Sequence, residues 1–227
     1  MVTKPSILQV PELDERPRQI FTLLYAALGP QHWWPSASAA ETVIGAILTQ
    51  NTSWNNVEKA IAVLRRHQLL TFERLQELET PKLAALIRST GYYNQKAKRL
   101  QEFSRRLLQE HGSFTQLTTL STKQLRRWLL SVRGIGPETA DSILLYACER
   151  PVFVVDNYTG RIFSRHNLVT AKASYDEIQA YVQQNFPPNL QAYNEFHALL
   201  VNVGKTFCRR RQPACDRCPL KNYDGQP

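Results

Sequence analysis

Residues 129–141 read LLSVRGIGPETAD, in which Gly134 and Gly136 flank Ile135 between two helical patterns. Glycine permits a tight turn and lets a ligand approach the backbone closely. The second helical pattern opens with Pro137, a residue favoured in the first position of a helix. Amides of the turn and of that first helical turn lack intrahelical partners, so they can hold a phosphate group. An ordinary turn between two helices is the alternative, and the full string is more specific than a lone GxG.

Apolar residues recur at three- and four-residue spacing along nearly the whole chain, for example at Ile20, Leu24 and Leu28. Helix starts are marked by Thr80-Pro81, read as an N-cap before a proline, and by Ser121 or Thr122. Residues 152–155 (VFVV) are the one β-favouring stretch, and they are too isolated to build a sheet. The sequence therefore predicts an all-α protein of about ten helices.

The charge balance points to a polyanionic partner. Lys and Arg number 28 against 19 Asp and Glu, which gives a formal net charge of +9. Nucleic acid is the leading candidate, and a basic protein without such a partner is the alternative. The first 15 residues lack an apolar core of signal-peptide length. No apolar run approaches the roughly 20 residues of a membrane span, so we expect a cytoplasmic protein with no membrane partner.

The cysteines gather near the C-terminus. Of the four, Cys208, Cys215 and Cys218 fall within one short stretch, and Cys148 stands apart. In a reducing cytosol this clustering suggests metal or iron–sulfur ligation over disulfides. We interpret Cys148 as a small core residue.

Five motifs in order give the chain a family resemblance. Besides the hairpin they are LTQNT at 48–52, GYYNQKA at 91–97, VVD at 154–156, and FHALL at 196–200, which leads into the cysteine tail. With them the chain resembles the endonuclease III superfamily of helix-hairpin-helix DNA glycosylases over roughly residues 30–224.

The resemblance implies two helical lobes with DNA and the active site in the cleft between them. One lobe is a six-helix barrel over residues 31–150 that contains the helix-hairpin-helix at about 125–148. The other combines residues 1–30 with 151–227 and includes a C-terminal cysteine loop at 208–224.

Asp156 is the candidate catalytic residue. By itself, an aspartate before Asn157-Tyr158 reads as a helix N-cap. The resemblance implies that it is the family's essential carboxylate. Breaking an N-glycosidic bond builds positive charge on the sugar, and a carboxylate stabilises that charge or orients the attacking water.

The resemblance also implies a monofunctional enzyme. Bifunctional members carry a lysine on the hairpin helix that forms a Schiff base with the sugar, and its slot here is Glu138. A carboxylate cannot form an imine. Lys205 and Lys96 are the amines that could replace it if the geometry allows. Whether Glu138 pairs with Arg133 or faces the pocket is left open.

Trp33-Trp34-Pro35 is the candidate pocket for the base. An extruded base gains about 1–3 kcal/mol by stacking on an aromatic ring, and a cationic alkylated purine adds cation–π attraction. A hydrophobic contact that joins the lobes is the alternative. With LTQNT and the hairpin, these residues resemble the 3-methyladenine glycosylase branch. The resemblance implies that Gln50 fills the vacated space and Tyr92 wedges into the stack, although Tyr92 could be a plain loop aromatic.

Phosphate contacts are expected from the hairpin and from basic residues near the cleft, including the Arg209-Arg210-Arg211 run. The residues that we expect to bind DNA are Arg133, Gly134, Ile135, Gly136, Thr139, Lys96, Arg209 and Arg210.

The cysteine tail matches the spacing of the [4Fe–4S] loop of endonuclease III at three positions. The fourth position holds Asp224 in place of cysteine. We expect a [4Fe–4S] cluster with Asp224 as its fourth ligand, while a zinc site with three sulfurs and one oxygen, or a loop without metal, remain alternatives.

The predicted function is base-excision repair. The enzyme would be a monomer that hydrolyses the N-glycosidic bond of a flipped, damaged base in double-stranded DNA, and the base would be an alkylated purine such as 3-methyladenine. It would associate with the nucleoid through DNA. Alternatives are a bifunctional glycosylase/AP lyase for oxidised pyrimidines, an adenine-mismatch glycosylase, and a non-catalytic module that binds damaged DNA. Asp156 discriminates the last of these, because a mere binder does not need it.

Overall fold

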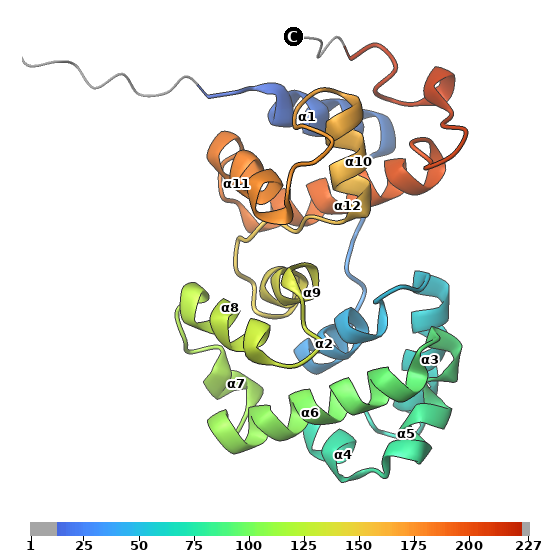
Figure 1. Cartoon of the computed structure of the whole chain (residues 1–227), viewed down its shortest axis with the longest axis vertical. Coiled ribbons are helices and arrows are strands. Elements are labelled where there is room, and N and C mark those ends of the chain that lie inside the picture. Colours follow the sequence, from blue (N-terminus) through green and yellow to red (C-terminus); the bar gives the residue numbers. More distant parts are fainter. Residues whose placement is uncertain (1–12, 224–227) are drawn as a thin grey trace, which may run out of the picture.

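The computed structural model describes residues 13–223, and these form α-helices with no β-strand among them. The predicted ligand Asp224 and the first 12 residues lie outside this range. None of the helices in the described range is both long and apolar enough to cross a membrane. Figure 1 shows the helices, which are α1 (Arg16–Leu28), α2 (Ala39–Leu48), α3 (Trp54–Arg66), α4 (Phe72–Glu77), α5 (Thr80–Leu86), α6 (Tyr93–His111), α7 (Phe114–Leu117), α8 (Thr122–Ser131), α9 (Pro137–Ser142), α10 (Asn157–Arg165), α11 (Tyr175–Asn185) and α12 (Leu190–Thr206). Three short elements complete them: η1 (Arg88–Thr90), the π-helix η2 (Ile143–Ala147) and η3 (Cys215–Arg217).

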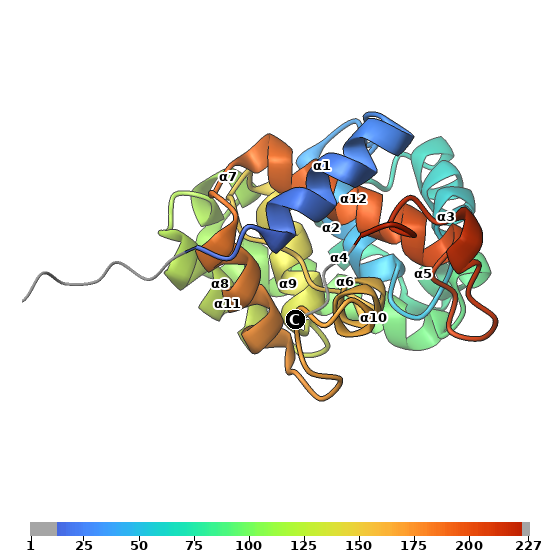
Figure 2. The same cartoon turned by 90° about the horizontal axis from the view of Figure 1, so that it is seen from above.

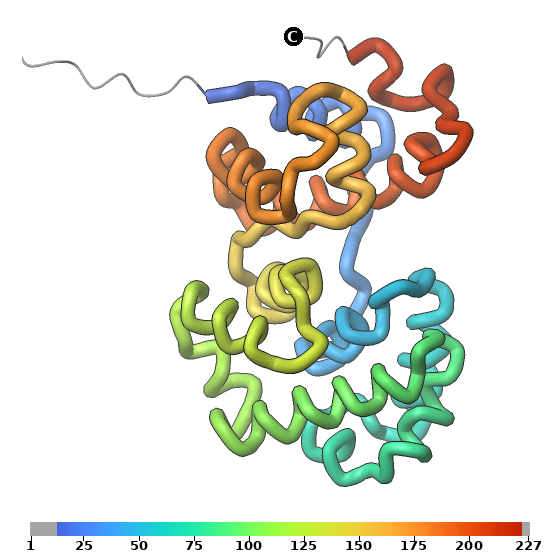
Figure 3. The backbone as a smooth tube through the Cα atoms, viewed as in Figure 1, coloured from blue at the N-terminus to red at the C-terminus, as the bar shows by residue number. Residues whose placement is uncertain are grey.

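The helices pack around two hydrophobic cores. One core belongs to α2–α9 and runs from Val43 to Leu144, and we call this part the lower lobe. The other joins residues of α1 to the chain from Leu145 to Leu220, and we call it the upper lobe. The boundary between the two cores therefore falls inside the π-helix η2, between Leu144 and Leu145. In Figure 3 the chain crosses between the lobes a second time, in the segment that leads from α1 to α2.

The upper lobe is organised around α12. Figure 2 shows α1 lying across this helix, and Phe21 of α1 makes an edge contact with Phe196 of α12 at 5.6 Å between ring centroids. Buried Glu195 accepts a hydrogen bond from the backbone amide of Gln31 at 2.7 Å. This bond ties the crossing segment to α12, and thus fixes the tryptophans that follow Gln31.

Helix caps agree with the sequence at one predicted start and differ at another. Of the predicted starts Ser121 and Thr122, Ser121 is the cap of α8, and it forms a full capping box with Gln124. Thr80 does not cap α5, because Glu79 holds that position and Thr80 is already the first helical residue. The Thr80 hydroxyl instead donates to Gln101 Oε1 at 2.6 Å, so a tertiary contact decides its role.

The stretch 152–155 forms no strand, and side chains satisfy part of its backbone. The amide of Phe153 donates to Gln183 Oε1 at 3.0 Å, and its carbonyl accepts from Gln179 Nε2 at 2.6 Å. Because Phe153, Val154 and Val155 are all buried, this extended segment is held in the upper core. It delivers Asp156 to the start of α10 at the boundary between the lobes.

A buried carboxylate joins the two lobes. Asp141 on α9 is 0% exposed and accepts two hydrogen bonds from Arg126 of α8, at 2.7 and 2.9 Å. From the upper lobe, the Tyr175 hydroxyl and Gln179 Nε2 on α11 donate to the same carboxylate, each at 2.8 Å. All of its partners are donors, so the carboxylate is compensated although it has no contact with water.

We predict that Asp141→Asn lowers the free energy of unfolding by about 3 kcal/mol, because it removes one member of a buried ion pair. Asp176→Asn is the matched control, since Asp176 is 81% exposed and lies 3.7 Å from the same Arg126. That control should cost less than about 1 kcal/mol. Urea denaturation measures both, and equal losses would contradict the role assigned to Asp141.

Candidate active site

A cavity of about 980 Å³ opens between the lobes and contains Asp156. Its walls come from the tryptophan segment, the loop between α2 and α3, the starts of α9 and α10, and α12. The lining side chains that bear on the chemistry are Trp33, Trp34, Gln50, Trp54, Arg99, Glu138, Asp156, Tyr158, Tyr175, His197 and Lys205. Because both lobes contribute, the cavity exists only when they are joined.

The two carboxylate oxygens of Asp156 have different surroundings. Its Oδ1 accepts from the Thr159 amide at 2.7 Å and from the Thr159 hydroxyl at 2.9 Å, which makes it the N-cap of α10. Its Oδ2 lies 3.7 Å from His197 Nε2, and the side chain is 10% exposed. Asp156 is therefore the N-cap of α10 and also a carboxylate that faces the cavity, so the two interpretations of the sequence are compatible.

The charge of Asp156 is stabilised by its neighbours. Burial by itself would raise the pKa of this carboxyl, but the His197 ring and the two Thr159 donors outweigh burial and hold the pKa below its usual value. At neutral pH the cavity therefore contains a carboxylate that is ionised and mostly shielded from water. Such a group can stabilise positive charge far better than one in bulk water.

Glu138 lines the same cavity from the first turn of α9. The surrounding protein strips water from its carboxyl group, and the charge of Asp156 adds to this effect, so the pKa of Glu138 is raised despite an opposing contribution from His197. Its side chain remains accessible from the cavity. Of the two possibilities left open by the sequence, the structure thus places Glu138 in the pocket.

Aromatic rings form one wall of the cavity. Trp54 lies against both residues of the tryptophan pair, with ring centroids 5.1 Å from Trp33 and 4.8 Å from Trp34. The Trp34 ring also packs against the Tyr146 ring, with 5.2 Å between their centroids. A Cβ atom on Gly45 would come within 3.1 Å of the Trp34 indole, so glycine there lets the ring pack closely against α2. Pro35 is exposed and does not line the cavity, which contradicts its predicted contact with the base.

Gln50 is held against the hairpin. Its Nε2 donates to the Gly134 carbonyl at 3.0 Å and to the Thr139 hydroxyl at 2.9 Å, while its Oε1 accepts from Arg99 Nη1 at 2.5 Å. The side chain faces the cavity mouth, but its amide group is fully engaged within the protein. Filling the vacated space in DNA stays a prediction for this residue.

The backbone of the hairpin requires glycine at position 134 and leaves amides free at the start of α9. Gly134 has φ +88°, and a Cβ atom there would overlap Arg99. The first intrahelical bond of α9 runs from Ala140 to Gly136, so the amides of Glu138 and Thr139 precede it without an intrahelical partner. These amides remain candidates for a phosphate contact.

Three predicted DNA contacts do not fit the structure as side-chain contacts. Ile135 is 5% exposed and its amide donates to the Val132 carbonyl at 3.0 Å, so neither group is available. Thr139 is 7% exposed and its hydroxyl is occupied by Gln50. Lys96 is 1% exposed, and its ammonium donates to the carbonyls of Leu48 at 2.9 Å and Thr90 at 2.7 Å.

The assignment of Lys96 to DNA is therefore wrong, because its charge stabilises the ends of α2 and η1. Burial, with a smaller contribution from Arg99, lowers its pKa to about 8, so Lys96 is still an ammonium donor at neutral pH. Its burial also removes it as an amine for Schiff-base chemistry. By contrast, Arg133, Gly136, Arg209 and Arg210 are exposed, and their DNA contacts stay predictions.

Tyr92 is exposed beside α6. It caps this helix in the left-handed conformation, with φ 46°, and its side chain is 67% exposed. An aromatic ring held this way by the backbone can reach a partner, and its role as a wedge stays a prediction.

Trp54 and His197 line the cavity but carried no usable signal in the sequence, whereas Lys205 was predicted there only as an alternative amine. Trp54 opens α3, and Lys205 and His197 belong to α12, with Lys205 Nζ 5.8 Å from the centroid of the Trp33 ring. His197 was part of the FHALL motif, but nothing in the motif places its ring beside Asp156. A cluster of tryptophans and a lone histidine in a helical pattern read first as core residues.

The cysteine loop provides three thiols but no described metal site. Cys208 and Cys218 are buried and Cys215 is exposed, and Arg165 Nη1 donates to Cys208 Sγ at 3.2 Å. Burial raises the pKa of the Cys218 thiol, and the nearby thiols of Cys208 and Cys215 raise it further. Among residues 13–223, no group of three or more His, Cys, Asp or Glu side chains is arranged to hold a metal ion. The fourth predicted ligand, Asp224, lies outside these residues, so the cluster stays a prediction.

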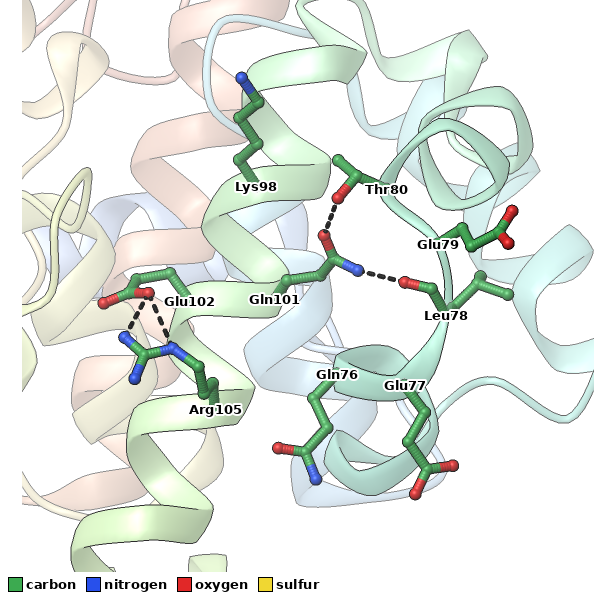
Figure 4. Close-up of a pocket in the computed structure, with 9 residues that line it drawn as sticks. All are labelled: Gln76, Glu77, Leu78, Glu79, Thr80, Lys98, Gln101, Glu102 and Arg105. Atoms are coloured by element: carbon green, nitrogen blue, oxygen red, sulfur yellow. Dashed lines mark hydrogen bonds and ion pairs between the residues drawn. The ribbon is translucent and has the colours of Figure 1, made fainter.

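A second hollow lies in the lower lobe between the α4–α5 region and α6. Figure 4 shows two sets of contacts there: Gln101 bridges Thr80 and the Leu78 carbonyl, and Glu102 pairs with Arg105 at 2.7 Å. The hollow has a volume of about 560 Å³ and shares no residue with the cavity around Asp156. Because this hollow contains neither Asp156 nor a tryptophan, we assign the chemistry to the other cavity.

Comparison with known proteins identifies the family. Residues 44–188 match the HhH-GPD superfamily of base excision DNA repair proteins, and the chain belongs to that superfamily. The enzyme is therefore a DNA N-glycosylase with a helix-hairpin-helix, as the sequence motifs predicted.

Individual relatives agree with this assignment. A protein of Methanocaldococcus jannaschii, whose own assignment as a DNA repair glycosylase is an inference, is 46% identical over 90% of this chain and 94% of its own length. The H. pylori 3-methyladenine DNA glycosylase MagIII, solved with 1,N6-ethenoadenine, is 33% identical, with a TM-score of 0.73 over 83% of this chain and 97% of that one. Endonuclease III trapped on DNA shares the fold, with a TM-score of 0.79 at 20% identity over 92% and 93% of the two chains.

Two sets of basic residues should respond differently to substitution. We predict that Arg209→Ala combined with Arg210→Ala weakens DNA binding and reduces the slope of log K against log salt by about 2, because about one phosphate contact is lost per arginine. Lys96→Met should leave that slope unchanged and lower the free energy of unfolding by about 2 kcal/mol, because it orphans two buried carbonyls. Salt-dependent fluorescence anisotropy and urea denaturation measure the two effects. A smaller salt slope in Lys96→Met would return that residue to the DNA interface.

Proposed function

We propose that this glycosylase acts as a monomer on double-stranded DNA, removes an alkylated purine such as 3-methyladenine, and leaves the DNA strand intact. The observation that carries the proposal is an ionised carboxylate, Asp156, facing a cavity walled by tryptophans. The base would enter the cavity by flipping out of the duplex.

Asp156 Oδ2 is the group for the chemical step. As the bond between base and sugar breaks, positive charge grows on the sugar, and a fixed carboxylate in a shielded site stabilises it or accepts a proton from the attacking water. Oδ1 is held by Thr159, so the carboxylate is oriented before the substrate arrives. No reorganisation of this group is needed during the reaction.

The aromatic wall of the cavity, formed by the tryptophans, favours a cationic base. The indole rings of Trp33, Trp34 and Trp54 contact one another and form one cluster. Stacking on such rings, combined with cation–π attraction, favours a positively charged purine over a neutral one. A pocket for an oxidised pyrimidine would instead need polar groups that pair with the base edge. The name of the H. pylori relative, a 3-methyladenine DNA glycosylase, supports the same substrate class.

Strand cleavage is not expected from the hairpin. Glu138 occupies the lysine slot and faces the cavity, and its carboxyl cannot form an imine with the sugar. One observation favours a second candidate, a glycosylase with lyase activity: the amine of Lys205 lines the same cavity. This amine is held over the Trp33 ring, and we assign it to that contact.

The decisive assay uses duplex DNA with alkylated bases. We predict that the wild type releases 3-methyladenine and that strand breaks appear only after alkali. Asp156→Asn should slow release at least about 100-fold, because it removes the charge that stabilises the transition state. Asp176→Asn, on the exposed face of α11, should match the wild type.

The alternatives have distinct outcomes in the same assay. Strand breaks without alkali, together with a borohydride-trapped adduct that disappears in Lys205→Met, would establish the lyase. Equal binding and no base release by wild type and Asp156→Asn alike would indicate a non-catalytic damage binder.

We also propose that Cys208, Cys215 and Cys218 hold an iron–sulfur cluster together with a fourth ligand beyond the described residues, for which Asp224 is the candidate. The spacing of the cysteines supports the proposal, because it matches three positions of a four-thiolate loop. We predict about four iron atoms per chain after anaerobic purification and loss of this iron in Cys218→Ala. Cys148→Ala is the control, since that thiol lies outside the loop. One zinc ion in place of iron, or no metal, would refute the cluster.

A further inference from the structure

His197 lies beside the catalytic carboxylate without a defined role. It comes from α12, is 7% exposed, and points Nε2 toward Asp156 Oδ2 at 3.7 Å. This separation is longer than a hydrogen bond, so the ring and the carboxylate interact across a short gap through their charge distributions. Nε2 is buried and has no hydrogen-bond partner among the described residues. An unpartnered buried ring nitrogen is costly, so its position requires an explanation.

Tyr146 is the neighbour that bears on which ring nitrogen carries the proton. Its hydroxyl lies 2.6 Å from His197 Nδ1. Burial, with the charges of Asp156 and Glu195, raises the pKa of Tyr146 well above its usual value, so the phenol keeps its proton. Nδ1 is the acceptor that the described residues offer to this proton. A ring that accepts at Nδ1 carries hydrogen at Nε2, and this N–H faces Asp156.

We propose that His197, with its tautomer set by Tyr146, is a positioning residue that directs Asp156 Oδ2 into the cavity and keeps this carboxylate ionised. The inference rests on the glycosylase activity of the family and on Asp156 as its carboxylate, and does not depend on which damaged base is removed. His197 acts through Asp156 and need not touch the base.

The groups around Asp156 show why such a residue is needed. Glu138 faces it from α9 with a like charge, and burial also disfavours the ionised form. Thr159 of α10 contributes donors to Oδ1 alone. Lys205 of α12 lines the same cavity, with its ammonium near Trp33. His197 is therefore the donor that faces Oδ2, the oxygen directed at the substrate.

Removing the ring should change the pH dependence of the chemical step. Without His197, burial acts on Asp156 with less opposition, so the pKa of Asp156 rises. In single-turnover assays, His197→Leu should lose activity at acidic pH that the wild type retains. We expect the midpoint of the acidic limb of its pH–rate profile to lie about one pH unit higher than in the wild type, the equivalent of about one pKa unit. DNA affinity should change little.

Conservative variants separate this role from simple packing. His197→Gln keeps an N–H near the position of Nε2 and should restore most of the acid-side activity. His67→Leu, at the exposed end of α3, should have the wild-type profile. Equal losses in His197→Leu and His197→Gln with an unchanged pH profile would overturn the proposal. The assays use whichever damaged base the wild type excises, so a failure of the 3-methyladenine assignment is seen separately.

The tautomer can be tested without an activity assay. Nitrogen-15 chemical shifts of the His197 ring should show hydrogen at Nε2 and not at Nδ1 in the wild-type protein. Tyr146→Phe should shift this population toward the other tautomer, because Nδ1 loses its donor. Hydrogen at Nδ1 in the wild type would overturn the proposal even if the His197 variants fail to fold.

Discussion

The buried Asp141 carboxylate is the interaction on which the geometry of the site depends. It accepts hydrogen bonds from α8 of the lower lobe and from two side chains of α11 in the upper lobe, so one charge fixes how the lobes meet. A charge without water is tolerated only when its donors are all in place. Since the cavity is lined from both lobes, this requirement holds Glu138 of one lobe opposite Asp156 of the other.

Asp156 combines the stability of the fold with the chemistry of the site. One oxygen caps α10, and the other faces the cavity beside His197. Its surroundings oppose one another, because burial disfavours the ionised carboxylate while His197 and Thr159 favour it. The upper lobe thereby supplies both the carboxylate and the groups that keep it charged. The lower lobe supplies much of the aromatic wall and the hairpin.

Local patterns in the sequence predicted much of the architecture. Helical periodicity predicted the all-α class, Ser121 or Thr122 marked the start of α8, and the two glycines placed the hairpin turn. These features depend on neighbours a few residues away, which the sequence contains explicitly. Predictions failed where a residue makes a contact with a distant part of the chain. Thr80 donates a hydrogen bond to Gln101, and the Lys96 ammonium donates to the carbonyls of Leu48 and Thr90.

What the sequence by itself determined is the family, the hairpin and the candidate carboxylate, because each is encoded in a short motif with a defined spacing. Only the tertiary structure placed Trp54, Tyr146 and His197 around that carboxylate. Their positions arise from the packing of the two lobes, and His197 meets Tyr146 across 51 residues of sequence. No local pattern specifies such a contact, because it depends on how the hydrophobic cores of both lobes are satisfied at once.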